Sequence, residues 1–434
     1  MTPSARLAAA IEVFTAIETD RRPAPDALKS WGVAHRFAGS GDRAAIAGLV
    51  YDALRRRASS AWLMDADDAR AILLGMLKRE RGLGTDAIAK LADGSNYGPA
   101  ALSDEERARL DSADMAAAPP HVAGDYPEWL DPQFSRVFGD DRAAEGAALA
   151  SRAPLDLRVN TLKADGDKAS ARLSDLNTEP SPWSPWGLRI QMAADAKSPA
   201  VHAEPAFIKG MIEVQDEGSQ LAALFTGAKP GEQVVDLCAG AGGKTLALAA
   251  MMQNKGQIFA TDDDKRRLAP IHDRLTRSGA RNVQVRTPKS IGGEIADLAG
   301  RIDLVLIDAP CTGTGSWRRN PDAKWRMRPG ALEQRTKEQA EILDRAVPLL
   351  KAGGRIAYVT CSVLDEENGA QVRGFLARHP DFAVQEPAEV VKALGADIGK
   401  AFAKVARLTG EGILMTPRTT GTDGFFVSVL RRNT

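Results

Sequence analysis

The sequence predicts an α/β protein whose C-terminal half is a doubly wound, mostly parallel sheet. Three observations support this prediction. Strand-length apolar runs alternate with helical segments from residue 232 onward, helical periodicity fills residues 1–115, and an apolar run starting at residue 234 ends in a glycine-rich turn. Alternation of strands and helices implies parallel strands with helices on both faces of the sheet.

The N-terminal region, residues 1–118, is predicted to be an all-helical domain. Apolar side chains recur there at helical spacing, as in the stretch 46–54, and strand patterns are missing. Ser103 with Glu106 three residues later forms a capping box and predicts one more helix start. The basic run 55–57 fits either a solvated helix end or an RNA contact.

The middle region, residues 127–225, is predicted to be a small α+β subdomain. An alanine-proline stretch at 116–120 precedes it and predicts a linker, because both prolines oppose continuation of a helix. A helix is expected at 141–150 and a strand at 155–160, followed by a turn-rich stretch.

The C-terminal region, residues 226–434, carries the strand and helix alternation. After the run at 234, further strands are expected at 257–261, 302–307, 355–360, 413–415 and 425–430. A glycine-containing turn joins the last two, which predicts an antiparallel hairpin at one edge of the sheet. A parallel sheet ending in such a hairpin is the class I, Rossmann-like methyltransferase arrangement.

The glycine-rich turn at 238–245 predicts a nucleotide-like ligand. Its glycines let the backbone approach a ligand, and a helix starting near Lys244 directs unpaired N–H groups toward it. A phosphate-binding loop is one alternative, but its opening glycine is replaced by Cys238; a tight turn without a ligand is another. S-adenosylmethionine fits best, because Asp262 follows the next strand where a ribose-binding acid is expected.

Composition narrows the class of protein. With 434 residues, 44% hydrophobic and 26% charged, the chain is typical of a soluble protein of two or three domains. The formal net charge is zero, so a site for a polyanion must be a local patch. Three widely spaced cysteines argue against zinc pairs and a disulfide framework, and no apolar run has the length of a membrane span. We therefore expect a cytoplasmic monomer without a metal or membrane partner.

Two of the cysteines lie just past the carboxyl ends of predicted strands. Cys311 lies in the sequence Asp-Ala-Pro-Cys after the strand at 302–307, and Cys361 lies in Thr-Cys-Ser after the strand at 355–360. Ligands bind at the carboxyl ends of strands in open α/β sheets, so both thiols would face the methyl donor. The alternative is that each cysteine is a small buried hydrophobic residue.

These motifs resemble those of the RsmB/Sun/nucleolar-protein family of S-adenosylmethionine-dependent RNA (cytosine-5) methyltransferases. The resemblance covers about three hundred residues, and the paired Pro-Cys and Thr-Cys-Ser motifs are its specific part. The residues 1–118 resemble more weakly the NusB-like, RNA-binding domain of bacterial members. The matching stretches are 127–130, 157–161, 214–220, 234–245, 308–311, 320–325, 360–362, 366–368 and 423–426.

The resemblance implies a role for each site residue. Cys361 would be the nucleophile that adds to carbon 6 of cytosine, and Cys311 would assist product release. Asp308 would hydrogen-bond the cytosine ring near N3 and could supply the proton that favours addition, while Lys244 would orient Asp308 or keep a thiol ionised. The implied donor pocket consists of Cys238, Ala239, Gly240, Ala241, Gly242, Gly243, Lys244, Asp262 and Asp308.

The sequence departs from the family pattern in two places. The turn has Gly240-Ala241 where the family usually has alanine and proline. Family members usually carry an acid after their third strand for contact with adenine. Here the stretch 285–289, between the strands expected at 257–261 and 302–307, offers none, although a backbone contact or the Thr287 hydroxyl could substitute. An alternative function therefore stays open, namely an RNA-binding ribosome-assembly factor with a degenerate methyltransferase fold.

A local basic cluster follows the Pro-Cys motif. Its five cations are interleaved with two tryptophans, a combination that suits a substrate strand whose target base is flipped out. An ordinary solvated loop is the alternative. The predicted RNA-binding residues are Arg318, Arg319, Lys324, Arg326 and Arg328.

Overall fold

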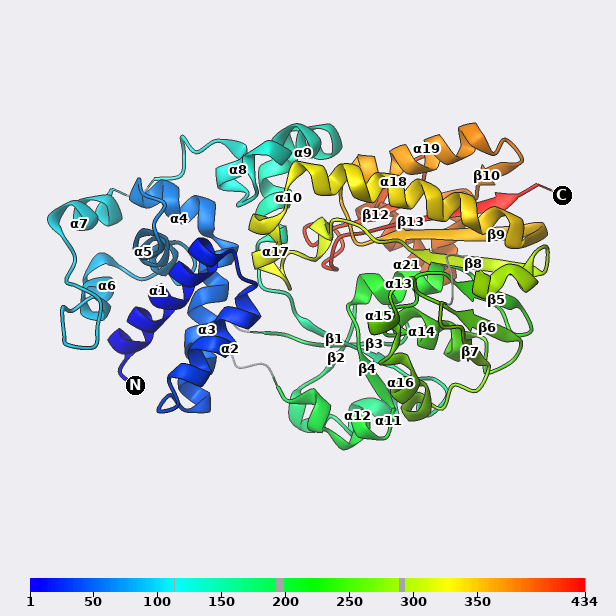
Figure 1. Cartoon of the computed structure of the whole chain (residues 1–434), viewed down its shortest axis with the longest axis horizontal. Coiled ribbons are helices and arrows are strands. Elements are labelled where there is room, and N and C mark those ends of the chain that lie inside the picture. The colour runs from blue at the N-terminus through cyan, green and yellow to red at the C-terminus, as the bar shows by residue number, and fades with distance from the viewer. Residues whose placement is uncertain (113, 193–198, 289–292, 434) are drawn as a thin grey trace. The chain divides into compact units, whose positions relative to one another are not determined.

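The computed structural model describes residues 1–112, 114–192, 199–288 and 293–433. The chain divides into two compact units (Figure 1). The first unit contains the described residues of 1–152 together with 317–327, and the second contains those of 153–192, 199–316 and 328–433. The division predicted from the sequence, into 1–118, 127–225 and 226–434, stays a prediction.

Helices fill the first unit, and no strand occurs among its described residues. The capping box at Ser103 and Glu106 is present as predicted, and the core is formed by apolar faces that include Phe14, Ile46 and Ile72. The helical prediction is confirmed for this region, while the likeness to NusB stays a prediction. The helices are α1 (Pro3–Asp20), α2 (Ala24–Ala34), α3 (Ser40–Arg55), α4 (Arg57–Met64), α5 (Ala69–Arg79), α6 (Thr85–Leu91), α7 (Asp104–Asp111), α8 (Pro120–Ala123), α9 (Asp131–Phe138), α10 (Arg142–Leu149) and α17 (Pro321–Arg326).

Two long-range contacts explain why this unit extends beyond the predicted boundary at 118. The buried carboxylate of Asp125 accepts hydrogen bonds from the backbone N–H and the hydroxyl of Ser59, both at 2.8 Å. Phe134 in α9 stacks on Trp317 with ring centroids 5.9 Å apart. Residues after the proline linker and residues of the distant segment 317–327 therefore share one core with the N-terminal helices.

A four-stranded antiparallel sheet forms the first part of the second unit. Its strand order is β2 (Glu179–Pro180), β3 (Gly187–Ile190), β1 (Leu155–Val159) and β4 (Ile212–Val214). Helices α11 (Gly166–Ala171) and α12 (Pro205–Ile208) belong to the same part of the second unit. The predicted strand at 155–160 is β1, whereas the predicted helix at 141–150 is α10 of the first unit.

A nine-stranded sheet forms the rest of the second unit. Its order is β11-β12-β13-β9-β8-β5-β6-β7, with β10 paired to β13. The strands β7, β6, β5, β8 and β9 are parallel, and β13 and β12 form the predicted antiparallel hairpin. The bounds are β5 (Gln233–Asp236), β6 (Gln257–Ala260), β7 (Val283–Val285), β8 (Ile302–Asp308), β9 (Leu350–Thr360), β10 (Phe382–Val384), β11 (Arg407–Leu408), β12 (Ile413–Met415) and β13 (Phe425–Arg432).

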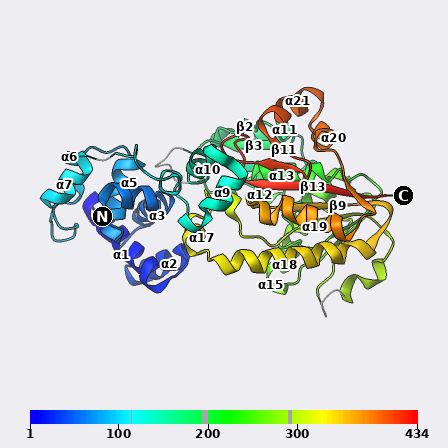
Figure 2. The same cartoon turned by 90° about the horizontal axis from the view of Figure 1, so that it is seen from above.

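Helices cover both faces of this sheet. Figure 2 shows α18 (Pro329–Ala346) and α19 (Gly369–Arg378) on one side of β9 and β13, and α13 (Glu217–Phe225) and α21 (Ala396–Val405) on the other. Further helices are α14 (Gly243–Met251), α15 (Lys265–Leu268), α16 (Ile271–Ser278) and α20 (Pro387–Val390). With both faces covered, the carboxyl ends of the strands are the place for a ligand. None of the helices described here is long and apolar enough to cross a membrane.

Candidate active site

The glycine turn after β5 has the backbone conformation that its sequence predicts. Gly240 and Gly242 have φ angles of +50° and +84°, in the left-handed region. A Cβ at Gly242 would lie 2.5 Å from Cγ1 of Ile271, so a larger residue is also excluded by packing. Helix α14 begins immediately afterwards at Gly243, and its first N–H groups lie at the carboxyl end of the sheet.

Asp262 is held directly against this turn. It follows β6, is buried, and accepts a hydrogen bond from the Gly240 N–H at 3.0 Å through Oδ2. Its Oδ1 accepts one from the Asp264 N–H at 2.9 Å. The structure therefore brings the predicted ribose acid and the glycine turn together. An open glycine backbone beside a fixed carboxylate fits a nucleoside that carries no phosphate.

Two arginines that the sequence did not single out brace the same turn. The guanidinium of Arg158 in β1 donates to the Gly243 carbonyl at 2.8 Å and to Oε1 of Gln215. Arg274 in α16 donates to the Ala241 carbonyl at 2.9 Å. Burial lowers the pKa of Arg158 to about 10, so its charge is costly to bury and is retained at a point that fixes the loop. The signal in the sequence for Arg158 was its place in the stretch 157–161, which resembles the family.

Cys238 lies in the turn among carboxylates. Burial and the charges of Asp236, Asp262 and Asp308 raise the pKa of its thiol well above the usual value. Asp236 accepts a hydrogen bond from the Thr245 hydroxyl at 2.7 Å, and burial raises the pKa of Asp236 to about 7. Cys238 therefore stays protonated, which suits a binding role and argues against a nucleophilic one.

Lys244 and Asp308 form an ion pair beside the turn. The Lys244 ammonium lies 2.7 Å from Oδ2 of Asp308, the last residue of β8, and 5.1 Å from the ring centroid of Phe425. Lys244 is buried, whereas a third of the Asp308 side chain is exposed. Of the two roles considered for Lys244, this geometry favours the orientation of Asp308.

The two strand-end cysteines are in contact. β8 and β9 are neighbouring parallel strands in which Asp308 pairs with Val359, and the Sγ atoms of Cys311 and Cys361 lie 3.3 Å apart. The hydrogen bond with Cys361 and burial raise the pKa of the Cys311 thiol well above its usual value. A pair of thiols that share a proton is suited to two different steps of one reaction.

Backbone contacts hold the two cysteine loops in register. The Gly315 N–H donates to the Cys361 carbonyl at 2.9 Å, and the Gly315 carbonyl accepts from the Gly424 N–H at 2.8 Å. A Cβ on Gly315 would overlap the carbonyl oxygen of Gly424. The Asn368 amide donates to the Ser362 carbonyl at 2.9 Å. Gly424 of the matching stretch 423–426 and Asn368 of the stretch 366–368 therefore help to hold the cysteine loops in place.

The basic cluster requires a correction. Arg318 and Lys324 are buried in the first unit, where an RNA strand does not reach them. The Lys324 ammonium donates to the Arg55 carbonyl at 3.1 Å, and burial lowers the pKa of Lys324 to about 7. Arg55 is itself buried and paired with Asp52 at 3.2 Å. RNA contact stays a prediction for Arg319, Arg326 and Arg328.

The region after β7 contains no acid at the position that the family pattern suggests. Arg286 lies 4.6 Å from the ring centroid of Phe259 and forms an ion pair with Asp297. Its backbone N–H donates to the Ala260 carbonyl at 2.8 Å. The neighbouring Lys289 lies outside the described residues. The Asp297 carboxylate, which pairs with Arg286, stands eleven residues further along the chain.

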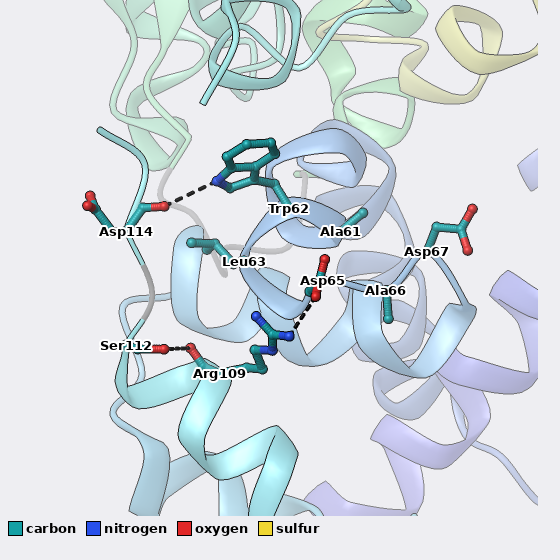
Figure 3. Close-up of a pocket in the computed structure, with 9 residues that line it drawn as sticks. All are labelled: Ala61, Trp62, Leu63, Asp65, Ala66, Asp67, Arg109, Ser112 and Asp114. Carbon is teal, nitrogen blue, oxygen red and sulfur yellow. Dashed lines mark hydrogen bonds and ion pairs between the residues drawn. The ribbon is translucent and has the colours of Figure 1, made fainter. Parts of the chain in front are cut away.

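A pocket in the first unit is separate from this chemistry. It has a volume of about 580 Å³ and lies where α4 and the residues around α7 meet (Figure 3). Trp62 and an ion pair between Arg109 and Asp65 at 2.6 Å line it. It contains none of the predicted site residues. In the described ranges, no group of three or more His, Cys, Asp or Glu residues is placed to hold a metal ion.

Comparison with known proteins finds matches to one methyltransferase family. A family model described as 16S rRNA methyltransferase RsmB/F matches residues 223–431, and one for the ferredoxin-like domain of RsmF/B-like methyltransferases matches residues 126–197. Ribosomal RNA small subunit methyltransferase B of Salmonella arizonae is 36% identical over 263 residues. Residues 126–197 and 223–431 of this chain thus match the RsmB/F methyltransferase family. That alignment covers 60% of this chain and 60% of the relative's length. The matched range 223–431 includes the glycine turn, Asp262, Asp308 and both strand-end cysteines.

Solved structures agree with the fold of the family. PH0851 is similar over 100% of this chain and 99% of its own, with a TM-score of 0.71 and 26% identity. NSun6 from Pyrococcus horikoshii, solved with SFG, an analogue of S-adenosylmethionine, has a TM-score of 0.60 and 21% identity over 71% of this chain and 98% of its own. The predicted Rossmann-like α/β methyltransferase fold is confirmed.

Proposed function

We propose that this chain transfers a methyl group from S-adenosylmethionine to carbon 5 of a cytidine in structured RNA, and that the RNA is ribosomal. The observation that carries this proposal is the contact between Cys311 and Cys361, whose Sγ atoms lie 3.3 Å apart next to the glycine turn and the Lys244–Asp308 pair. Methyl transfer to an ordinary oxygen or nitrogen needs no thiol. Methyl transfer to carbon 5 of cytosine needs one thiol to add and a means of releasing it.

The donor is assigned to the residues at the carboxyl ends of β5 and β6. The turn 238–244 provides backbone N–H groups, and we assign the Asp262 carboxylate to accept from the ribose hydroxyls. When bound there, S-adenosylmethionine supplies an electrophilic methyl group on its sulfonium sulfur. Arg158 and Arg274 hold the turn in the conformation that this requires.

Cys361 is assigned the covalent step. Its thiol loses a proton and its sulfur forms a bond to carbon 6, so the electron pair of the carbon 5–carbon 6 double bond moves toward carbon 5, which becomes nucleophilic. Transfer of the methyl group to carbon 5 would leave the donor as a neutral thioether. A base from the solvent then takes the remaining carbon 5 proton, and the sulfur–carbon 6 bond breaks. These two events restore the double bond and return Cys361 as a thiolate.

Two further residues are assigned to assist this reaction. Cys311 assists the last step, the release of Cys361, and Asp308 assists the first step, the addition of Cys361 to cytosine. The Cys311 S–H is in hydrogen-bond range of the sulfur that must leave, so it stabilises the departing thiolate of Cys361. The partly exposed Asp308 side chain, which the Lys244 ammonium contacts, is assigned to the cytosine edge, where its carboxyl group would donate to N3 when it carries a proton. Lys244 acts through Asp308 and is a positioning residue.

An assembly factor that binds RNA without efficient methyl transfer is the second candidate. The observation that favours it is the missing acid after β7, where Thr287 stands in the sequence and Arg286 pairs with Asp297. The fixed Asp262 and the contact between the two thiols favour the enzyme. Calorimetric titration with S-adenosylmethionine separates the two candidates, because an assembly factor would not bind the donor at millimolar concentration.

Bisulfite sequencing of ribosomal RNA tests the proposed reaction. A deletion strain is complemented with the parent chain or with Cys361→Ala, and the RNA is sequenced after bisulfite treatment. We expect at least one cytidine to resist conversion with the parent chain and to be converted in the deletion strain and with Cys361→Ala. Identical bisulfite patterns in all three strains would overturn the proposal.

A further inference from the structure

Glu367 is a buried carboxylate that the proposed mechanism does not use. It lies in the short 3-10 helix Asp365–Glu367 after β9 and has no exposed surface. Its Oε1 accepts from the Thr312 N–H at 2.8 Å and from the Gln339 amide at 3.1 Å, and its Oε2 accepts from the Thr312 hydroxyl at 2.5 Å. The carboxylate is therefore clamped to the residue that follows Cys311.

No cation neutralises this carboxylate among the residues that the structure describes. The groups that donate to it come from Thr312 and Gln339 and are all neutral. The Gln339 amide also donates to the Pro310 carbonyl at 2.9 Å, so the clamp spans both sides of Cys311. A buried, unpaired negative charge exerts a strong field on neighbouring ionisable groups because little solvent screens it.

The clamp acts on only one of the two cysteine loops. The loop of Cys361 is held by neutral groups, namely the Asn368 amide and the Gly315 N–H. The loop of Cys311 is held by a charge, and that charge contributes to the raised pKa of the Cys311 thiol, after the hydrogen bond with Cys361 and burial. The loops that carry the two thiols at adjacent strand ends are thus held by different kinds of contact.

We propose that Glu367 is the positioning residue that assigns the two thiols their roles. Through its clamp on Thr312 it keeps Cys311 as the protonated hydrogen-bond donor, and Cys361 is left as the thiol that ionises and attacks. This inference deepens the proposed function by giving a reason for the choice of nucleophile. It concerns the ionisation of two thiols, and it is therefore testable without RNA and without the methyl donor.

Alkylation by iodoacetamide measures the two thiols separately. The full chain is treated with a small amount of reagent over a range of pH, and peptide mass spectrometry gives the initial rate at each cysteine. The limited dose matters because alkylation of one thiol alters its neighbour at 3.3 Å. In the parent chain we expect Cys361 to react faster than Cys311 throughout the neutral range, because only the thiolate is nucleophilic.

Glu367→Gln removes the charge and keeps the clamp. Its amide oxygen can accept from the Thr312 N–H and from Gln339, and its NH₂ can donate to the Thr312 hydroxyl. We expect the alkylation rate of Cys311 relative to Cys361 to rise about threefold to tenfold, with the pH profile of Cys311 moving to lower pH, since one pKa unit changes the thiolate fraction about tenfold. Glu366→Gln is the matched control, because it removes the same charge one residue away.

Three outcomes decide the matter. A raised Cys311 rate in Glu367→Gln and an unchanged rate in Glu366→Gln support the proposal. Equal effects of both variants, or no effect of either, overturn it. If Glu367→Gln does not fold, as judged by circular dichroism, the parent chain still decides, because faster alkylation of Cys311 than of Cys361 there contradicts the assigned roles. Failure of the bisulfite experiment leaves these results unaffected, so the two proposals fail separately.

Discussion

The Sγ atoms of Cys311 and Cys361 lie 3.3 Å apart at the ends of the neighbouring parallel strands β8 and β9. At this separation two thiolates would repel each other strongly, so the pair carries at most one negative charge at neutral pH. At least one of the two sulfurs therefore carries a proton, which it can donate to the other. Each cysteine therefore affects the reactivity of the other, and a variant of one is informative only beside a variant of the other.

Asp262→Ala is expected to weaken binding of S-adenosylmethionine by about 1–3 kcal/mol, because the ribose hydroxyls would lose a buried charged acceptor. Isothermal titration calorimetry measures the change. Asp263→Ala is the control, since Asp263 is the next acid along the chain and pairs at the surface with Arg345 at 3.0 Å. If Asp262→Ala binds the donor as tightly as Asp263→Ala does, Asp262 only holds the backbone of Gly240 and Asp264.

Gly315→Ala is expected to displace the loop of Cys311, because the new methyl group would overlap the carbonyl oxygen of Gly424. We expect a loss of stability of about 1–3 kcal/mol from overpacking, together with a large loss of methyl transfer. Urea unfolding and a radiolabelled methyl-transfer assay measure the two effects. Gly330→Ala in α18 serves as the control, since nothing lies within 4 Å of its added Cβ. Equal results for the two variants would show that the contact with Gly424 is unimportant.

The sequence predicted those features of the fold that depend on local pattern. The strands β5, β6 and β8 and the hairpin of β12 and β13 appear where apolar runs and turn residues placed them. The approach of Asp262 to Gly240 followed from topology alone, because adjacent parallel strands end at the same edge of a sheet. The sequence did not predict the short strands β10 and β11, because they have too few residues to show a hydrophobic period.

Features set by distant partners were missed or misjudged. The polar neighbours of Lys324 predict a surface cation, yet its amine is buried against the carbonyl of Arg55, 269 residues earlier in the chain. The bracing role of Arg158 and the clamp formed by Glu367 likewise depend on contacts with loops that only the folded chain brings near. Composition and spacing carry no information about such pairs.

Lys324→Met is expected to flatten the dependence of stability on pH. In the folded chain the pKa of Lys324 is lowered to about 7 by burial, whereas in the unfolded chain it is about 10.4. Between these values the unfolded state binds one more proton, so the free energy of unfolding rises with pH, by at most about 1.4 kcal/mol per pH unit from this group. Below pH 7 both states are protonated and this rise disappears.

Urea denaturation of the parent chain and the variant at pH 7, 8 and 9 tests that expectation. Lys29→Met, which alters an exposed lysine of α2 in the same unit, is the control and should keep the parent slope. A slope in Lys324→Met equal to that of Lys29→Met would mean that Lys324 stays charged in the folded chain.

Arg326→Ala combined with Arg328→Ala is expected to weaken RNA binding and to reduce its salt dependence. Both side chains are exposed, and the slope of log affinity against log salt should fall by about one unit for each phosphate that is no longer neutralised. Filter binding of ribosomal RNA at several salt concentrations measures this. Arg373→Ala removes another exposed arginine that is ion-paired, as Arg326 is, and serves for comparison. If the slope of log affinity against log salt is the same as in the parent chain, these arginines are solvated surface residues that do not contact RNA.

Cys361→Ala and Cys311→Ala should fail in different ways. Without Cys361 no sulfur adds at carbon 6, so methyl transfer and covalent capture of the RNA should both disappear. Without Cys311 the attack by Cys361 remains possible, but its departure loses the hydrogen-bond donor that lies 3.3 Å away. This variant should methylate poorly and accumulate a protein–RNA adduct, visible as a slow band on a denaturing gel.

Cys238→Ala is the control for these two variants, because Cys238 is the remaining cysteine and its thiol is held protonated by the surrounding carboxylates. It should form no lasting adduct, and any loss of activity should follow a loss of donor affinity. An adduct that builds up in Cys361→Ala and is missing in Cys311→Ala would reverse the two roles and make the Pro-Cys thiol the nucleophile. If all three variants methylate RNA as the parent chain does, the contact between Cys311 and Cys361 is a packing contact and the proposed reaction is wrong.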